Sequence, residues 1–180
     1  MDDRLRAICL ARGAFLTREA LALGHDDRTL ARMVRLGILH RIRWGAYTFG
    51  DIWASADERT RHAITARAAV LVAKAPVAVS HVTAVLEHTD TWWGLDLSEV
   101  HLTRLDGHAG RAEAGVRQHQ GVVIPGDVVT RGPLLVTSPT RAALELTALA
   151  DMEAALVSID SMLHAGSCTL DGLRALGRVR

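Results

Sequence analysis

Residues 15–50 read FLTREALALGHDDRTLARMVRLGILHRIRWGAYTFG, and this stretch decides the fold expected for the amino-terminal part of the chain. A short helix is predicted from Thr17, whose hydroxyl group is a candidate N-cap, and it ends at the next glycine. A second helix follows a cap supplied by Asp26 or Asp27 and also stops at a glycine. Two short helices separated by a tight turn are therefore expected here.

A two-stranded ribbon is predicted directly after the second helix. Residues 38–43 alternate apolar and polar side chains, Trp44 and Gly45 supply a turn, and residues 46–49 return. Helix, turn, helix and ribbon in this order outline a winged helix-turn-helix. Double-stranded DNA is the first partner that this outline suggests.

The second helix is predicted to have one apolar and one basic face. Apolar side chains recur at i, i+3 and i+4 from Leu30, which defines a buried stripe. The opposite face carries Arg28, Arg32 and Arg35. A recognition helix contacts bases mainly through its first turns, so Arg28, Thr29 and Arg32 are the candidate base-reading residues.

Further arginines are candidates for contacts with DNA phosphates. Arg41 and Arg43 are two residues apart on the predicted strand and so are expected on one face of the ribbon. Arg18 in the first helix and Arg35 in the second complete the predicted DNA-binding set. The alternative is a solvated basic surface on a domain that binds no DNA. Trp44 and Tyr47 are expected to pack within this small domain.

The charge distribution separates the head of the 180-residue chain from the rest. Residues 1–50 contain nine arginines and five acidic residues, whereas residues 51–180 contain twelve basic and fifteen acidic residues. A basic head on a mildly acidic body is typical of a DNA-binding domain joined to a domain with another task. No apolar run is long enough to cross a membrane, and the amino terminus lacks a secretory layout. A cytoplasmic, nucleoid-associated protein with free buried thiols at Cys9 and Cys168 is expected.

Residues 53–180 are predicted to form a mixed α/β domain that ends in helices, so the fold class is α+β with a first domain over residues 1–52. Gly50 to Ser55 is the expected joint between the two. The expected helices span residues 56–75, 81–88, 139–150, 152–165 and 170–180, and the expected strands span 77–79, 99–105, 116–119, 127–130 and 134–137. Residues 107–115 are expected to be a loop. The last predicted helix continues to Arg180 without a terminal motif. A domain truncated at its C-terminus is therefore one interpretation.

No catalytic, cofactor or metal site is predicted. The chain has neither a P-loop nor a zinc-type spacing of histidines and cysteines. Ser80 is interpreted as a helix cap, His81 and His88 as locally packed residues, and His101 as half-buried. The tandem Trp92 and Trp93 are interpreted as core residues, with partner anchors as the alternative if they are exposed.

Three blocks together resemble actinobacterial members of the AbiEi antitoxin family. They are LTREALALGHDDRTLARMVRLGILHRIRWGAYTFG at 16–50, VAVSHVTAVLEH at 77–88 and VVTRGPLLVTSPTRAALEL at 128–146. The similarity covers nearly the whole chain. It implies an antitoxin of a type IV toxin–antitoxin system that represses its own promoter and counters a nucleotidyltransferase toxin. In such a protein the helix at 28–36 would enter the major groove, with the ribbon at 40–48 as the wing.

One alternative function follows from the same resemblance. Many relatives continue into a Vsr-like (DUF559) nuclease-type domain, so the chain could be the DNA-targeting module of a truncated nuclease-family protein. Such a nuclease needs an acidic residue near a lysine, but Lys74 is the only lysine and no Glu-x-Lys occurs. A protein-interaction module with a vestigial head is a third interpretation. Because one winged domain covers little DNA, two heads are expected, supplied by a homodimer or by adjacent sites.

Overall fold

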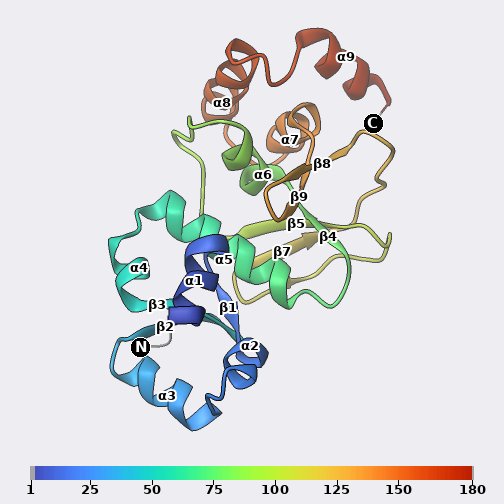
Figure 1. The fold of residues 1–180 in the computed structure, drawn as a ribbon. Helices are drawn as coiled ribbons and strands as arrows, with labels where there is room; N and C mark the ends of the chain where they lie inside the picture. Colours follow the sequence, from blue (N-terminus) through green and yellow to red (C-terminus); the bar gives the residue numbers. More distant parts are fainter. Residues whose placement is uncertain (1–2, 180) are drawn as a thin grey trace. The chain divides into compact units, whose positions relative to one another are not determined.

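The computed structural model describes residues 3–179 and divides the chain into two compact units, residues 1–74 and 75–180 (Figure 1). Both units mix helices and strands, which agrees with the predicted α+β class. The division lies after helix α5 (Glu58–Val72), later than the boundary expected at residue 52. Helix α5 belongs to the first unit because its Ala68 packs against Leu16 and Ala46.

The first unit is built from short helices around a small antiparallel sheet, with strand order β1-β3-β2. Its elements are α1 (Asp3–Arg12), β1 (Phe15–Leu16), α2 (Thr17–Ala22), α3 (Asp27–Arg35), β2 (Leu39–Arg43), β3 (Ala46–Phe49), α4 (Gly50–Ser55) and α5. One core cluster joins Leu5 of α1 and Leu30 of α3 to Phe15 and Phe49 of the sheet. Burial of these large apolar side chains fixes α3 against the sheet.

Helix α4 occupies the segment that was expected to be a joint, so that expectation was wrong. Ile52 packs against the core cluster, and Asp51 forms an ion pair with Arg6 of α1. These contacts come from residues distant in the sequence, which explains why the local pattern did not reveal the helix.

The cap of α3 is confirmed, whereas the predicted cap of α2 is wrong. The Thr29 backbone N–H donates a hydrogen bond to the Asp26 carboxylate at 2.7 Å. At α2 the N-cap is Leu16, and its backbone N–H donates to the Glu19 carboxylate at 2.7 Å. A carboxylate in the first turn of the helix thus does what was expected of the Thr17 hydroxyl.

The Asp26 cap provides a test of how α3 is held. Asp26→Ala is expected to lower the free energy of unfolding by about 1 kcal/mol, because the Thr29 N–H loses its acceptor. Urea denaturation followed by circular dichroism measures the change. Asp26→Asn keeps an acceptor at the same place and is the matched control, so an equal loss in both variants would contradict the capping role.

The second unit contains a six-stranded mixed sheet with the order β6-β7-β5-β4-β9-β8. Its strands are β4 (Val77–Val79), β5 (Val100–Arg104), β6 (Ala112–Glu113), β7 (Val116–His119), β8 (Val128–Arg131) and β9 (Leu134–Thr137). The pairs β4–β9 and β5–β7 are parallel, and the other neighbouring pairs are antiparallel. All expected strands are present, and β6 is a short addition within the expected loop.

The helices described in the second unit are α6 (His81–His88), α7 (Pro139–Leu146), α8 (Met152–His164) and α9 (Leu170–Val179). Helix α6 packs on strands β5 and β9 and against α7, and α7 in turn contacts α8 and α9 (Figure 1). Small side chains such as Ala84, Ala142 and Ala143 are fully buried and allow this close packing. The expected cap of the last helix is confirmed, since the Gly172 N–H donates to the Thr169 hydroxyl at 3.1 Å.

The two tandem tryptophans are not both core residues. The side chain of Trp93 is 60% exposed, so the core interpretation is wrong for that residue, whereas Trp92 is partly buried. Cys9 and Cys168 are buried free thiols, as expected.

Candidate nucleic-acid interface

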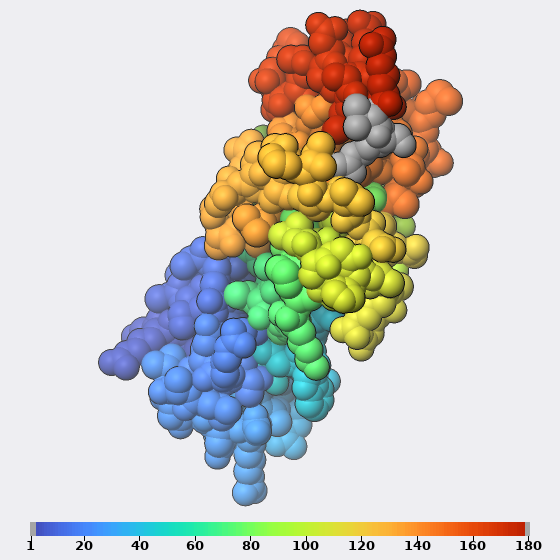
Figure 2. Space-filling model, turned by 90° about the vertical axis from the view of Figure 1, so that its right-hand side faces the viewer, coloured from blue at the N-terminus to red at the C-terminus, as the bar shows by residue number. Residues whose placement is uncertain are grey.

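Helix α3 has the two faces that its sequence predicts. Leu30 is buried, and Met33 and Val34 pack partly buried against the same core cluster. The three arginines of the opposite face are exposed, as is Thr29. Figure 2 shows side chains of the light-blue segment, which includes α3, projecting into the solvent. The helix thus presents guanidinium groups on a rigid element held by its apolar side.

Strands β2 and β3 form the predicted ribbon, with one irregularity. Their register shifts between Arg41 and Arg43, so the strict alternation of faces does not hold through this step. A bulge of this kind re-aims side chains along a strand. Arg41 is exposed, whereas Arg43 is half-buried. Of the two arginines expected on one face, Arg41 is the more accessible.

The two aromatic residues of the ribbon differ in their surroundings. Tyr47 stacks on Phe15 with ring centroids 5.7 Å apart, as expected for a packing residue. Trp44 is 87% exposed, so the prediction that it packs was wrong. It stands in the tight turn beside Gly45, whose φ of +78° is a backbone conformation that favours glycine. In such a turn the side chain of Trp44 has no neighbouring strand to cover it.

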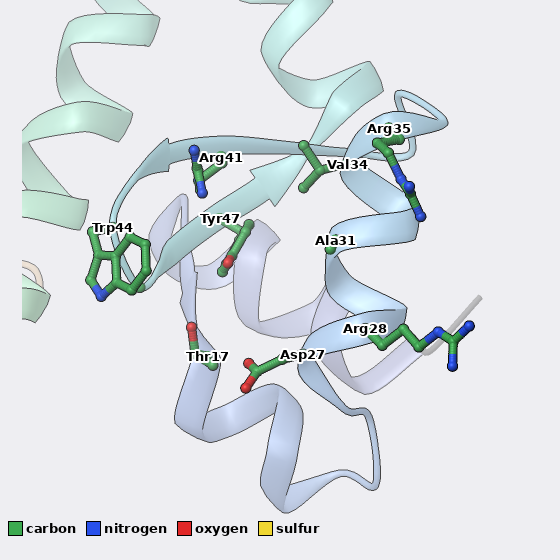
Figure 3. A pocket seen from close by; sticks show the side chains of 10 residues that line it. Thr17, Asp27, Arg28, Ala31, Val34, Arg35, Arg41, Trp44 and Tyr47 are labelled. Atoms are coloured by element: carbon green, nitrogen blue, oxygen red, sulfur yellow. The ribbon is translucent and has the colours of Figure 1, made fainter.

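A groove of about 810 Å³ runs between α3, the start of α2 and the ribbon. Figure 3 shows Ala31, Val34 and Tyr47 in its middle, Arg41 and Trp44 on the ribbon, and Arg28 and Arg35 extending from α3. Thr17, Asp27 and Gly45 complete the lining. The groove therefore has an apolar floor and a rim that carries arginines from two separate elements.

The exposed arginines of α2, α3 and β2 are not neutralised within the described part of the chain. Over residues 3–179 no ion pair or side-chain hydrogen bond involves the guanidinium groups of Arg18, Arg28, Arg32, Arg35 and Arg41. By contrast, Arg6 and Arg12 of the same unit are paired with Asp51 and Glu19. Asp27 is the acidic residue in the groove lining, and its single charge does not offset those of Arg28, Arg35 and Arg41, which line the groove with it.

The arrangement is suited to binding a polyanion. Guanidinium groups donate paired hydrogen bonds to phosphate or to the edge of a guanine, and several of them on one surface release counterions from DNA. The structure places Arg28, Arg35 and Arg41 around the groove, and Arg32 on the exposed face of α3. Thr17, Asp27 and Trp44 were not among the predicted site residues. For Trp44, its place in a predicted two-residue turn was the signal in the sequence that could have indicated exposure.

No protein-family model matches the chain, and a comparison with curated proteins also finds no match. Within residues 3–179 no helix combines the length and apolar character needed to cross a membrane. The same residues contain no group of three histidine, cysteine or acidic side chains that could hold a metal ion.

Proposed function

We propose that the first unit is a winged helix-turn-helix domain that binds double-stranded DNA. Helix α3 enters the major groove, where Arg28, Thr29 and Arg32 read base edges. The β2–β3 ribbon is the wing, and Arg41 and Arg43 contact the phosphate backbone. Arg18 and Arg35 add phosphate contacts on the helical side.

The observation that carries this proposal is the set of five exposed arginines that form no ion pair with any residue between 3 and 179. A solvated surface needs no particular arrangement of its charges. Here Arg28 and Arg35 of α3 and Arg41 of the ribbon line one groove from two sides, and both elements are held by packing. Rigid placement of the donors favours binding, because little conformational freedom is lost.

We further propose that the chain represses its own promoter as the antitoxin of a type IV toxin–antitoxin system, and that it counters a nucleotidyltransferase toxin. The three sequence blocks that resemble AbiEi antitoxins support this extension. Co-expression with a nucleotidyltransferase encoded beside it tests the antitoxin role. Restored growth supports the role, and unrelieved toxicity contradicts it.

The DNA-binding proposal is tested with the chain's own upstream DNA and a scrambled duplex of equal length. Binding measured by fluorescence anisotropy is expected to prefer the upstream sequence. Its affinity should fall steeply between about 50 and 200 mM salt, because each neutralised phosphate releases counterions. Two protein chains per duplex are expected by analytical ultracentrifugation, with half-sites about 10 base pairs apart. Weak binding that ignores both sequence and salt would refute the proposal.

Single arginine variants separate base reading from phosphate contact. Arg32→Ala is expected to weaken binding to the upstream duplex by about 1–3 kcal/mol and to reduce its sequence preference. Arg41→Ala is expected to weaken binding to both duplexes alike and to make the salt dependence shallower. Arg178→Ala removes an exposed arginine from α9 of the second unit and is the matched control. Unchanged affinity of Arg32→Ala would contradict the assignment of α3.

A further inference from the structure

The second unit contains a cavity of about 590 Å³ that the proposed DNA interface does not use. It lies among β5, β7, α6, α7 and the loop that follows β7. Its lining comprises His81, Thr103, His119, Gln120, Gly121, Val122, Ile124, Arg141 and Glu145. The volume is that of a site for a small organic molecule.

A buried guanidinium group forms one wall of the cavity. Arg141 is 4% exposed, and its Nη1 donates to the Asp127 carboxylate at 2.5 Å and to the Val122 carbonyl at 2.9 Å. Its Nε donates to the Glu145 carboxylate at 2.7 Å. No hydrogen bond within residues 3–179 uses its Nη2, which is therefore a donor open to the cavity.

Imidazole rings form a second wall. The rings of His81 and His119 are stacked with centroids 3.7 Å apart, and His119 Nε2 lies 2.9 Å from His101 Nδ1. His81 Nδ1 lies 3.0 Å from the Ser80 hydroxyl, but its Nε2 has no partner among the described residues. The expected cap role of Ser80 was half right: it is the N-cap residue of α6, but its side chain makes no cap hydrogen bond.

His81 also has a strained backbone. Its φ of +52° lies in the left-handed region, which a non-glycine residue adopts at a cost in free energy. The Glu145 carboxylate holds this conformation by accepting the His81 N–H at 3.1 Å. Such strain persists only where the surrounding structure fixes the conformation, and the strained residue here is one that lines the cavity.

Thr103 supplies the observation that points to a missing ligand. Its side chain is 1% exposed and lines the cavity, yet its Oγ1 has no hydrogen-bond partner within residues 3–179. A buried hydroxyl group without a partner costs free energy, so an occupant that pairs with it would be stabilised. Gly121 keeps the space open: a Cβ there would lie 2.9 Å from Thr103 Cγ2 and 3.0 Å from Arg141 Nη2.

The charges of the site favour an uncharged ligand. Two carboxylates offset the single guanidinium, which removes the attraction for an anion. The carboxylates are already engaged: Glu145 accepts from Arg141, His81 and Thr137, and Asp127 accepts from Arg141 and the Ile124 N–H. An organic cation would instead meet the open N–H donors of Arg141.

We propose that this cavity binds an uncharged nucleobase that carries a carbonyl group beside a ring N–H, as uracil and guanine do. The carbonyl oxygen accepts from Arg141 Nη2 and the Thr103 hydroxyl. The ring N–H donates to the open imidazole nitrogen of His81. All residues of this site belong to the second unit. The proposal can therefore be tested independently of DNA binding by the first unit.

The experiment measures binding of free nucleosides to the full chain by saturation-transfer NMR and titration. Uridine and guanosine are expected to bind. N3-methyluridine, which has lost the ring N–H, is expected to bind at least tenfold more weakly than uridine. Failure of both nucleosides to bind at millimolar concentration would overturn the proposal. So would displacement of uridine by inorganic phosphate or by spermidine.

The variant Thr103→Val tests the role of the hydroxyl group without removing volume. It is expected to weaken uridine binding at least tenfold while leaving Tm unchanged or higher, because an unpaired buried hydroxyl is replaced by a methyl group. Thr130→Val, on the exposed part of β8, is the matched control and should change neither quantity. A lower Tm with undiminished uridine binding would show that the hydroxyl serves the fold, and would overturn its assignment to the ligand.

Discussion

Replacing Arg141 by methionine is expected to lower the free energy of unfolding of the second unit by about 3–5 kcal/mol. Its guanidinium group is almost fully buried and bridges the carboxylates of Asp127 and Glu145. Removing it leaves two carboxylates close together without a compensating charge. It also removes the hydrogen bond from Nη1 to the Val122 carbonyl, which ties the loop between β7 and β8 to α7.

Urea denaturation of the variant measures this loss of stability. Two further variants serve as controls for the removal of an arginine and for the unpaired charge. Arg131→Met removes an exposed arginine on β8 and is expected to change the free energy by less than about 0.5 kcal/mol. The double variant Asp127→Asn, Arg141→Met also removes the negative charge of Asp127, which Arg141 no longer offsets. It should therefore be more stable than Arg141→Met alone. A loss below about 1 kcal/mol in the single variant would show that the network contributes little to the fold.

Local sequence patterns predicted the elements whose stability depends on near neighbours. The cap at Asp26 and the ribbon around Trp44 were found because each depends on residues a few positions apart. The apolar stripe of α3 was visible for the same reason. Helix α4 and the exposure of Trp44 were missed. The first depends on the distant partner Arg6, and the second depends on where a turn points a side chain.

The cavity of the second unit could not be predicted from spacing alone. Ser80, His81 and His101 were each interpreted separately, as a cap, a packed residue and a half-buried strand residue. The parallel pairing of β5 with β7 brings His119 beside His101 and His81, and β9 leads into α7, which carries Arg141. Parallel strand pairs join segments that are separated in the sequence, so no local sequence pattern predicts which histidines lie in contact.

Acidification is expected to destabilise the second unit, chiefly through His81. Burial, together with the neighbouring imidazoles of His119 and His101 and the charge of Arg141, lowers the pKa of His81 from 6.5 to about 3. Glu145 lies 3.6 Å from His81 Nδ1, but its negative charge is already paired with Arg141. Burial also lowers the pKa of His119, so both rings resist protonation in the folded state.

The sign of the effect follows from proton binding. Below pH 6.5 the unfolded chain takes up a proton at His81 that the folded chain refuses until about pH 3, so stability falls across this window. The loss is about 1.4 kcal/mol per pH unit, or about 2 kcal/mol by pH 5.

Urea denaturation at several pH values measures this loss of stability. His81→Asn does not titrate and tolerates a positive φ, so it should remove most of this loss, whereas exposed His164→Gln should not. Stability that instead rises on acidification would mean that His81 is protonated and paired with Glu145 in the folded protein.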